Sequence, residues 1–238
     1  MLHKIHLENI LFLDIETVPE VEKYEQLSPK KQELFAHKRA YQREKDDTPP
    51  EEFYVRAGIW AEFGKIVCIS VGFFNPNASE RNFRLKSFYG EEKQILIEFK
   101  HLLEGYFYKP QHLLCAHNGK EFDFPYIARR MLIHGIALPE KLNLFGKKPW
   151  EVPHLDTLEL WKFGDYKHYT SLKLLTEVLQ IPSPKDDIDG SQVAAVYYEE
   201  KDIDRIIIYC EKDVIAIAQV FLRLRQEELL EEHEITST

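Results

Sequence analysis

Residues 10–16 read Ile-Leu-Phe-Leu-Asp-Ile-Glu, an apolar run that ends in two acids. Its length and its lack of Gly and Pro favour a buried strand. Because alternate side chains share one face of a strand, Asp14 and Glu16 are expected to point the same way. Two carboxylates about 4 Å apart repel each other by roughly 4 kcal/mol at an effective dielectric constant near 20, and a divalent cation removes that cost. The strand end is therefore a candidate site for Mg²⁺ or Mn²⁺, which prefer oxygen ligands.

The spacing of these two acids is weak evidence when it is taken alone. Since 40 of the 238 residues are acidic, an acid pair separated by one residue is expected about seven times by chance. The alternative is a strand end that exposes two solvated acids. The position of the two acids at the end of an apolar strand favours the cation site, because ligands bind at the carboxyl ends of strands.

The rest of the chain predicts an α/β domain. Further strands are expected over 65–74, 82–89 and 112–116. Helices are expected over 28–45, 91–104, 125–134, 155–163, 171–180, 191–199 and 203–229. This order predicts an antiparallel meander of the first three strands, helices on both faces of the sheet and a helical C-terminal half. The acidic tail after Leu230 is expected to fray.

Asp123 and Asp213 are further candidate ligands. Asp123 follows the strand at 112–116 and stands two residues before Pro125, so it is either a helix N-cap or a ligand. Asp213 lies in the long helix four residues after Tyr209, which places both on one helical face. An unpaired charge among apolar neighbours is costly, so Asp213 either faces solvent or is held by a cation.

Composition excludes several classes of protein. With 31 basic and 40 acidic residues the net charge is −9, which argues against a charge-driven nucleic-acid coat protein. No stretch of about 18 apolar residues predicts a membrane helix, and no membrane partner is expected. Three cysteines in apolar runs argue against a disulfide framework, so a cytoplasmic location is expected.

Other segments have less specific interpretations. Residues 28–45 carry six basic and two acidic residues and predict either an arm that grips a nucleic-acid backbone or a solvated helix face. His117 and Asp156 are interpreted as a loop histidine and a helix-start charge, with a role beside the acidic site as the alternative. The run Asp187-Ile-Asp189-Gly190 fails as an EF-hand, because Val196 stands where Glu is required, and predicts a turn.

Three motifs occur in order along the chain: Asp14-Ile-Glu16, Asn118-x3-Phe122-Asp123-x-Pro125-Tyr126 and Tyr209-x3-Asp213. They resemble the ExoI, ExoII and ExoIII motifs of the DEDDy branch of 3′–5′ exonucleases. The closest resemblance is to the proofreading domain of family B DNA polymerases and to stand-alone bacterial proteins related to it. It implies a ribonuclease H-like fold with a mixed five-stranded sheet, and one exonuclease domain over 1–238. That domain would carry a basic, helical insertion at about 20–60 and the acidic tail at 230–238.

The resemblance also implies roles for individual residues. Asp14 would bridge two divalent cations, Mg²⁺ or Mn²⁺, while Glu16 and Asp213 complete the first cation site. Asp123 would hold the second cation largely through water, and Tyr209 would orient the attacking water. Substrate contacts are implied for Thr17, Asn118 and Phe122. Two cations suit phosphodiester hydrolysis, since one activates water and the other neutralises the leaving oxygen.

The expected function is therefore a two-metal 3′–5′ exonuclease acting on single-stranded DNA. One alternative is an RNase D-like 3′–5′ exoribonuclease, because the sequence does not identify a reader of the 2′-hydroxyl. The other is a non-catalytic nucleic-acid-binding module of the same fold. The expected partner is a single strand with a free 3′ end, with DNA favoured over RNA.

Overall fold

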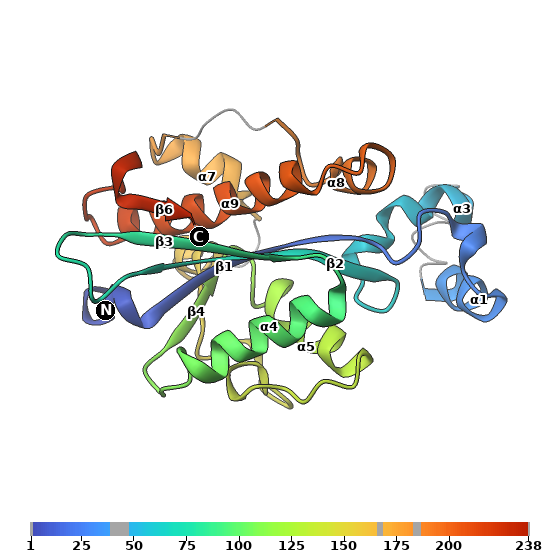
Figure 1. The fold of residues 1–238 in the computed structure, drawn as a ribbon, viewed down its shortest axis with the longest axis horizontal. Helices are drawn as coiled ribbons and strands as arrows, with labels where there is room; N and C mark the ends of the chain where they lie inside the picture. The colour runs from blue at the N-terminus through green and yellow to red at the C-terminus, as the bar shows by residue number, and fades with distance from the viewer. Residues whose placement is uncertain (1, 39–47, 166–168, 183–186, 238) are drawn as a thin grey trace.

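A computed structural model describes residues 2–38, 48–165, 169–182 and 187–237 (Figure 1). Within these ranges, six strands form one sheet in the order β5-β4-β1-β2-β3-β6. The strands are β1 Ile10–Pro19, β2 Gly64–Phe74, β3 Phe83–Tyr89, β4 Leu113–Ala116, β5 Leu155–Asp156 and β6 Ile235–Ser237. β1, β2 and β3 form the expected antiparallel meander. β4 is parallel to β1, β5 to β4, and β6 to β3, so the sheet is mixed as predicted.

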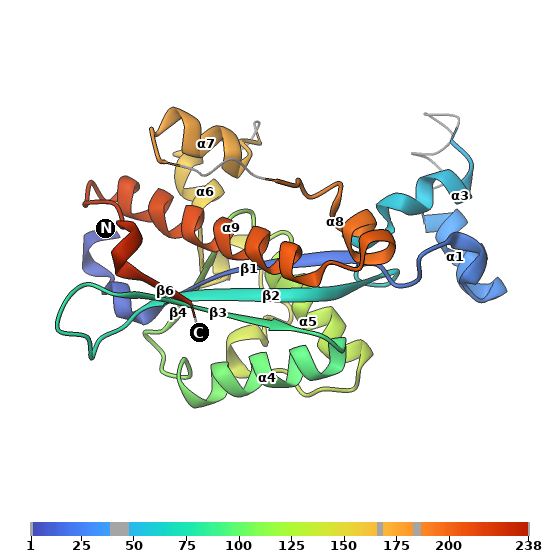
Figure 2. The ribbon, with the colours of Figure 1, turned by 45° about the horizontal axis from the view of Figure 1, so that its top comes forward.

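Helices cover both faces of this sheet. They are α1 Pro29–Lys38, α3 Pro50–Phe53, α4 Glu92–Gly105, α5 Asp123–Ile133, α6 Thr157–Lys162, α7 Leu172–Val178, α8 Val193–Ala195 and α9 Ile203–Leu224. Shorter 3₁₀ turns are Leu2–Lys4, Leu7–Asn9, Tyr24–Gln26, η4 Tyr54–Ile59, Glu140–Leu142, Pro149–Glu151 and Glu232–Glu234, and a π turn spans Val196–Glu200. α4 and α5 lie on one face, and α7, α8 and α9 lie on the other (Figure 2). In the described ranges no helix is long and apolar enough to cross a membrane.

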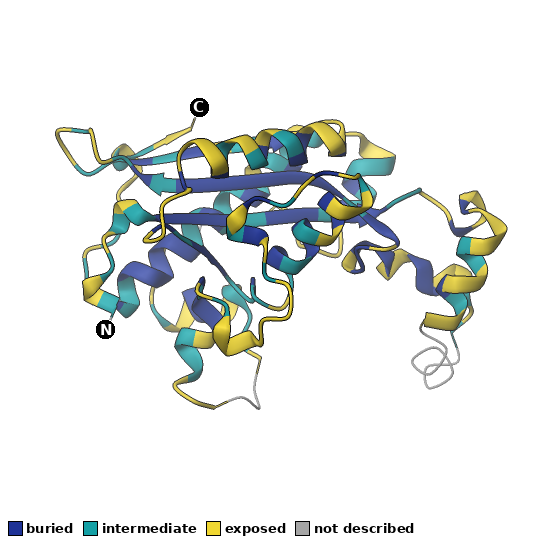
Figure 3. Cartoon of the chain, turned by 90° about the horizontal axis from the view of Figure 1, so that it is seen from below, coloured by how far each residue is buried: buried dark blue, intermediate teal, exposed yellow. Residues whose placement is uncertain are grey.

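The central strand β1 is buried between the two helical layers (Figure 3). Its odd-numbered residues Leu11 and Leu13 join the core beneath α4 and α5. Its even-numbered residues Ile10 and Phe12 join the core beneath α9. The period of two that governs strands therefore directs the next even residues, including Asp14, toward α9.

α9 packs along β1 and β2 through one apolar face. Its buried residues recur at helical spacing and include Ile206, Cys210, Val214, Ile217 and Phe221. The helix ends at Leu224 rather than at the predicted 229, and Gln226 takes a positive φ of 57°. The Gln219 side chain pairs with both backbone groups of Leu230 at 2.9 Å, which draws the following chain back against the helix.

The expectations of five strands and a frayed tail are wrong. Residues 235–237 add β6 as a sixth strand on β3. The Arg81 guanidinium donates to the Glu234 carboxylate at 2.6 Å and to the carbonyls of Glu228 and Leu229. An Arg–carboxylate pair of this kind is directional and charge-assisted. It therefore holds the tail beside β3 although the tail is rich in acidic residues.

Side chains from residues 24–35 and 53–63 form a separate, largely aromatic cluster beyond the end of β1, at the right of Figure 1. Phe35 of α1 packs edge-on against Tyr54 and Phe63, with ring centroids 5.2 Å apart in each case. α1 confirms the first part of the helix expected over 28–45. Residues 39–45 of that prediction lie outside the described ranges.

Candidate active site

Asp14 and Glu16 stand on the face of β1 that α9 covers. In the antiparallel register they lie opposite Ser70 and Cys68 of β2. The register shifts between Glu16 and Thr17, and such an irregularity re-aims the side chains beside it. Glu16 is only 7% exposed, so the alternative of two solvated acids does not describe this pair.

Cys210 of α9 lies against the same two acids. One ligand atom from each of Asp14, Glu16 and Cys210 falls within 4.8 Å of the others. The Cys210 thiol lies 3.6 Å from the Asp14 carboxylate, to which it donates a weak hydrogen bond. Burial raises the pKa of this thiol well above its ordinary value, so it is a neutral donor. Sequence reasoning missed Cys210; its position three residues before Asp213, on one helical face, is the signal that could have found it.

The structure brings four predicted carboxylates within electrostatic range of one another. Burial raises the pKa of Asp14 well above its ordinary value, and the charges of Asp213, Glu16 and Asp123 raise it further. Burial also raises the pKa of Glu16, and among the neighbouring charges that of Asp213 raises it most. These acids come from β1, from α5 and from α9, so only the folded chain assembles them.

Asp123 is the first residue of α5 rather than its N-cap, a position that Phe122 occupies. Its side chain is 3% exposed. Burial raises its pKa to about 8, against the opposing effect of backbone hydrogen bonds that include one to Ile15. The charges of Asp156 and Asp213 raise it as well. The capping alternative is therefore wrong, and Asp123 points toward β1.

Tyr209 lies one helical turn before Asp213 and forms a hydrogen bond with it. Burial raises the pKa of its hydroxyl far above the ordinary value, and the charges of Asp213, Glu16 and Asp14 act in the same direction. The phenol therefore keeps its proton at neutral pH. It can donate a hydrogen bond and orient a neighbouring group, but it is not a base.

Asp156 holds the loop that leads from β4 to Asp123. One carboxylate oxygen accepts hydrogen bonds from the backbone N–H groups of Asn118 at 2.9 Å and Leu158 at 2.9 Å. The other accepts from the N–H of Lys120 at 3.1 Å. Asp156 is thus the N-cap of α6, as the sequence suggests, and it also fixes the loop through Asn118, which has a positive φ of 62°. His117 anchors that loop through Thr157 and Thr170, each at 2.9 Å.

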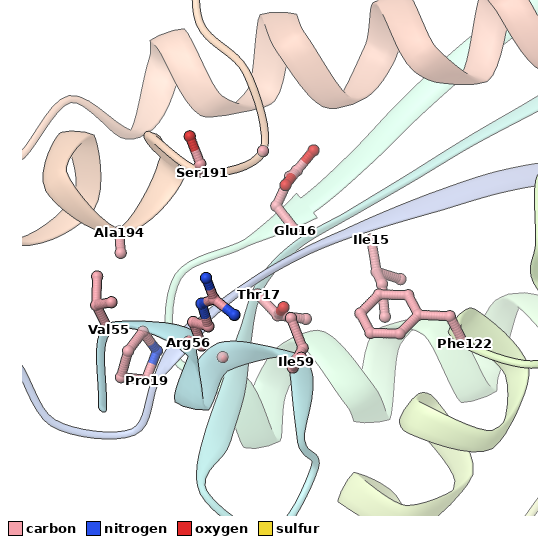
Figure 4. A pocket seen from close by; sticks show the side chains of 12 residues that line it. Ile15, Glu16, Thr17, Pro19, Val55, Arg56, Ile59, Phe122, Ser191 and Ala194 are labelled. Carbon is pink, nitrogen blue, oxygen red and sulfur yellow. The ribbon is translucent and has the colours of Figure 1, made fainter. Parts of the chain in front are cut away.

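A cavity of about 510 Å³ adjoins Glu16 (Figure 4). Its walls include the predicted substrate-contact residues Thr17 and Phe122, together with Ile15. Asn118, the third predicted contact, is not among its lining residues. The 187–191 segment closes one side as the predicted turn, where Asp189 accepts hydrogen bonds from Ser191.

The donor set suits hard divalent cations. Within the described ranges, no Lys or Arg lies within ion-pair distance of Asp14, Glu16 or Asp123. Their oxygens form a buried, mutually repelling group, and such charges are normally paired or bound to metal. Mg²⁺ and Mn²⁺ prefer oxygen ligands of this kind.

The sheet and its two helical layers form a ribonuclease H-like fold. The structure is similar to that of the family B DNA polymerase from the hyperthermophilic archaeon Pyrobaculum calidifontis, with a TM-score of 0.56 and 14% sequence identity. That match covers 88% of this chain but only 23% of the polymerase chain. A search of curated proteins finds no match to this sequence.

A sequence-family comparison gives the more specific result. The model of a predicted 3′–5′ exonuclease family, related to the exonuclease domain of PolB, matches residues 59–236. The chain belongs to this family, and the resemblance to the exonuclease domain of family B DNA polymerases is confirmed. Membership implies a nucleic-acid substrate.

Proposed function

We propose that this chain is a 3′–5′ exonuclease of the DEDDy type that removes nucleotides from the 3′ end of single-stranded DNA, with residues 1–238 as one exonuclease domain. The observation that carries the proposal is the group of four acids contributed by β1, α5 and α9, of which Glu16 and Asp123 are buried and Asp14 and Asp213 are half-buried. A binding module has no need for such a group, because repulsion among buried acids destabilises the fold.

Asp14, Glu16, Asp123 and Asp213 would hold two divalent cations, Mg²⁺ or Mn²⁺. When bound, these cations supply an activated water and neutralise the leaving oxygen. Tyr209 keeps its proton and orients the attacking water through its hydroxyl. Thr17 and Phe122 contact the terminal nucleotide from the cavity wall. Asn118 contacts the substrate from the loop that Asp156 holds. The three cysteines are free thiols, which suits a reducing compartment such as the cytoplasm.

A labelled-strand assay tests this function. Single-stranded DNA and RNA of one sequence, each labelled at the 5′ end, would be incubated with the full chain and Mn²⁺ or Mg²⁺. The proposal predicts a ladder that shortens from the 3′ end, faster for DNA than for RNA. Faster shortening of RNA would replace the DNA substrate with RNA. Tight binding without shortening would indicate a non-catalytic module.

A further inference from the structure

One wall of the cavity beside Glu16 comes from the N-terminal segment of the chain. Val55, Arg56, Gly58 and Ile59 of η4 line the same cavity as Glu16. Three of these four residues precede the region matched by the exonuclease family, which begins at residue 59. Figure 4 shows the Arg56 side chain on the side of the cavity formed by Thr17. The family match therefore assigns no role to this wall.

This wall is fixed firmly to the body of the protein. At Gly58 the η4 backbone lies so close to β1 that an added Cβ would stand 3.1 Å from Val18. The Tyr126 hydroxyl of α5 donates to the Gly58 carbonyl at 2.7 Å. The Arg130 guanidinium donates to the Ala61 carbonyl at 2.8 Å, just beyond η4. These contacts hold the η4 side chains at a constant position relative to the strand that carries Glu16.

The side chains of the wall suit a nucleotide. Val55 and Ile59 are 65% and 54% exposed, so η4 presents apolar surface to the cavity. Arg56 is exposed and is the cation among the lining residues. Within the described ranges it has no carboxylate at ion-pair distance, and its guanidinium lies 5.6 Å from the centroid of the Phe53 ring. The wall thus offers a positive charge between apolar patches.

The charge matters because the neighbouring acids repel a phosphate. The chain has a net charge of −9. Glu16 lines this cavity, and Asp14 lies beside Glu16. A planar guanidinium pairs with two phosphate oxygens at once and stays charged at any working pH. A strand that enters the cavity would find at Arg56 a cation that opposes this repulsion.

We propose that Arg56 binds a backbone phosphate of the nucleic-acid strand, while Val55 and Ile59 pack against its 3′-terminal nucleotides. This inference rests on the proposed function, and it makes the N-terminal segment part of the substrate site. Arg56 then governs affinity for the strand, whereas the four acids govern hydrolysis.

Binding and turnover by the full chain test this role. The variants are Arg56→Ala and Arg56→Lys. The control for loss of one charge is Lys93→Ala, at an exposed residue of α4. Fluorescence anisotropy in EDTA gives the Kd for a 5′-fluorescein oligothymidylate of 12 nucleotides, and hydrolysis with Mn²⁺ gives KM and kcat. Arg56→Ala is expected to raise Kd and KM about tenfold with kcat within about twofold, and Arg56→Lys to restore part of the affinity.

Salt dependence separates a phosphate contact from a structural effect. Loss of one contact to a single strand should reduce the slope of log Kd against log salt by about 0.7, and Lys93→Ala should leave it unchanged. An Arg56→Ala protein that matches Lys93→Ala in Kd, KM and slope would overturn the inference while the hydrolysis remained. Loss of affinity and slope in a chain that hydrolyses nothing would support Arg56 and contradict the proposed exonuclease.

Discussion

The carboxylate of Asp156 accepts a hydrogen bond from the backbone N–H of Asn118 at 2.9 Å. Asp156 is 2% exposed and belongs to β5 and the start of α6, whereas Asn118 begins the loop that leads to Asp123. One side chain therefore links the second motif of the chain to the neighbouring strand. The position of Asp123 depends on a residue that is itself not one of the proposed ligands.

Replacement of Asp156 by Ala should therefore affect both stability and turnover. It removes the cap of α6 and leaves the N–H groups of Asn118 and Lys120 without their acceptor, so we expect a loss of about 2–4 kcal/mol in the free energy of unfolding. Displacement of Asp123 should lower kcat about tenfold or more. Urea unfolding and steady-state hydrolysis measure the two effects.

Asp202→Ala is the matched control, because Asp202 is the exposed N-cap of α9 and accepts from Arg205 at 3.1 Å. It should cost about 1 kcal/mol of stability and leave kcat unchanged. Asp156→Asn keeps one acceptor oxygen. Its free energy of unfolding and its kcat should lie between those of Asp156→Ala and Asp202→Ala. Equal kcat values for Asp156→Ala and the wild type would show that this link does not position the site.

Asp14→Asn should stabilise the metal-free protein while it abolishes hydrolysis. The variant removes one charge from a buried group whose pKa values are raised by burial and mutual repulsion, so we expect a gain of about 1–3 kcal/mol in the free energy of unfolding. The exposed control Asp204→Asn in α9 should change stability by less than about 0.5 kcal/mol. Thermal unfolding in EDTA is the measurement, and a destabilised Asp14→Asn protein would contradict the repulsion argument.

Mn²⁺ should raise the Tm of the wild type more than that of Asp14→Asn. A ligand that binds only the folded protein adds about 2.7 kcal/mol of stability at one hundred times its Kd. Differential scanning fluorimetry over a range of Mn²⁺ concentrations follows this effect. Equal Tm shifts in the two proteins would mean that the cation binds elsewhere.

Tyr209→Phe should reduce turnover less than the loss of a carboxylate does. The change removes a hydroxyl that forms a hydrogen bond with Asp213 and retains the ring, so we expect kcat to fall by about 10- to 100-fold. Asp213→Asn should lower it by about 1000-fold or more, equivalent to about 4 kcal/mol. Tyr106→Phe, at an exposed residue beyond α4, serves as the control. A larger loss for Tyr209→Phe than for Asp213→Asn would contradict the assigned roles.

His154 should make stability depend on pH in the acid range. Its side chain is 3% exposed. Its Nδ1 accepts from the Leu114 N–H at 3.2 Å and its Nε2 donates to the Lys141 carbonyl at 2.7 Å, so the neutral ring satisfies both neighbours. Burial lowers its pKa from the ordinary 6.5 to about 4. Because the unfolded chain takes up this proton first, the stabilisation is complete above pH 6.5 and about 3 kcal/mol is lost as pH falls to about 4.

Comparison with His154→Gln isolates this contribution. The raised pKa values of Asp14 and Asp123 act in the opposite direction, since protonation of those acids relieves repulsion in both proteins. The difference in unfolding free energy between wild type and His154→Gln should therefore shrink from pH 7 to pH 4. A difference that stays constant over that interval would contradict the assignment.

Local sequence patterns predict the parts of this structure that depend on local physics. The apolar run before Asp14 predicts β1, and the i, i+4 spacing places Tyr209 beside Asp213. Three further features join segments that lie far apart in the sequence. They are the hydrogen bonds of Asp156 to the loop, the contact of Cys210 with Asp14 and the pairing of β6 with β3. Such contacts leave no periodic signal, because tertiary packing selects them. The local sequence leaves Asp123 open as a helix N-cap or a ligand for the same reason: contact with β1 decides where its side chain points.

We propose that the acids around Asp14 form a divalent-cation site at which nucleic acid is hydrolysed from the 3′ end. The most direct measurement adds Mn²⁺ stepwise to chelator-treated wild type and Asp14→Asn in the presence of 5′-labelled single-stranded DNA. The wild type should gain a ladder that shortens from the 3′ end as Mn²⁺ rises, and Asp14→Asn should gain none. Shortening by Asp14→Asn at the wild-type rate, or no shortening by the wild type at any Mn²⁺ concentration, would contradict this cation site.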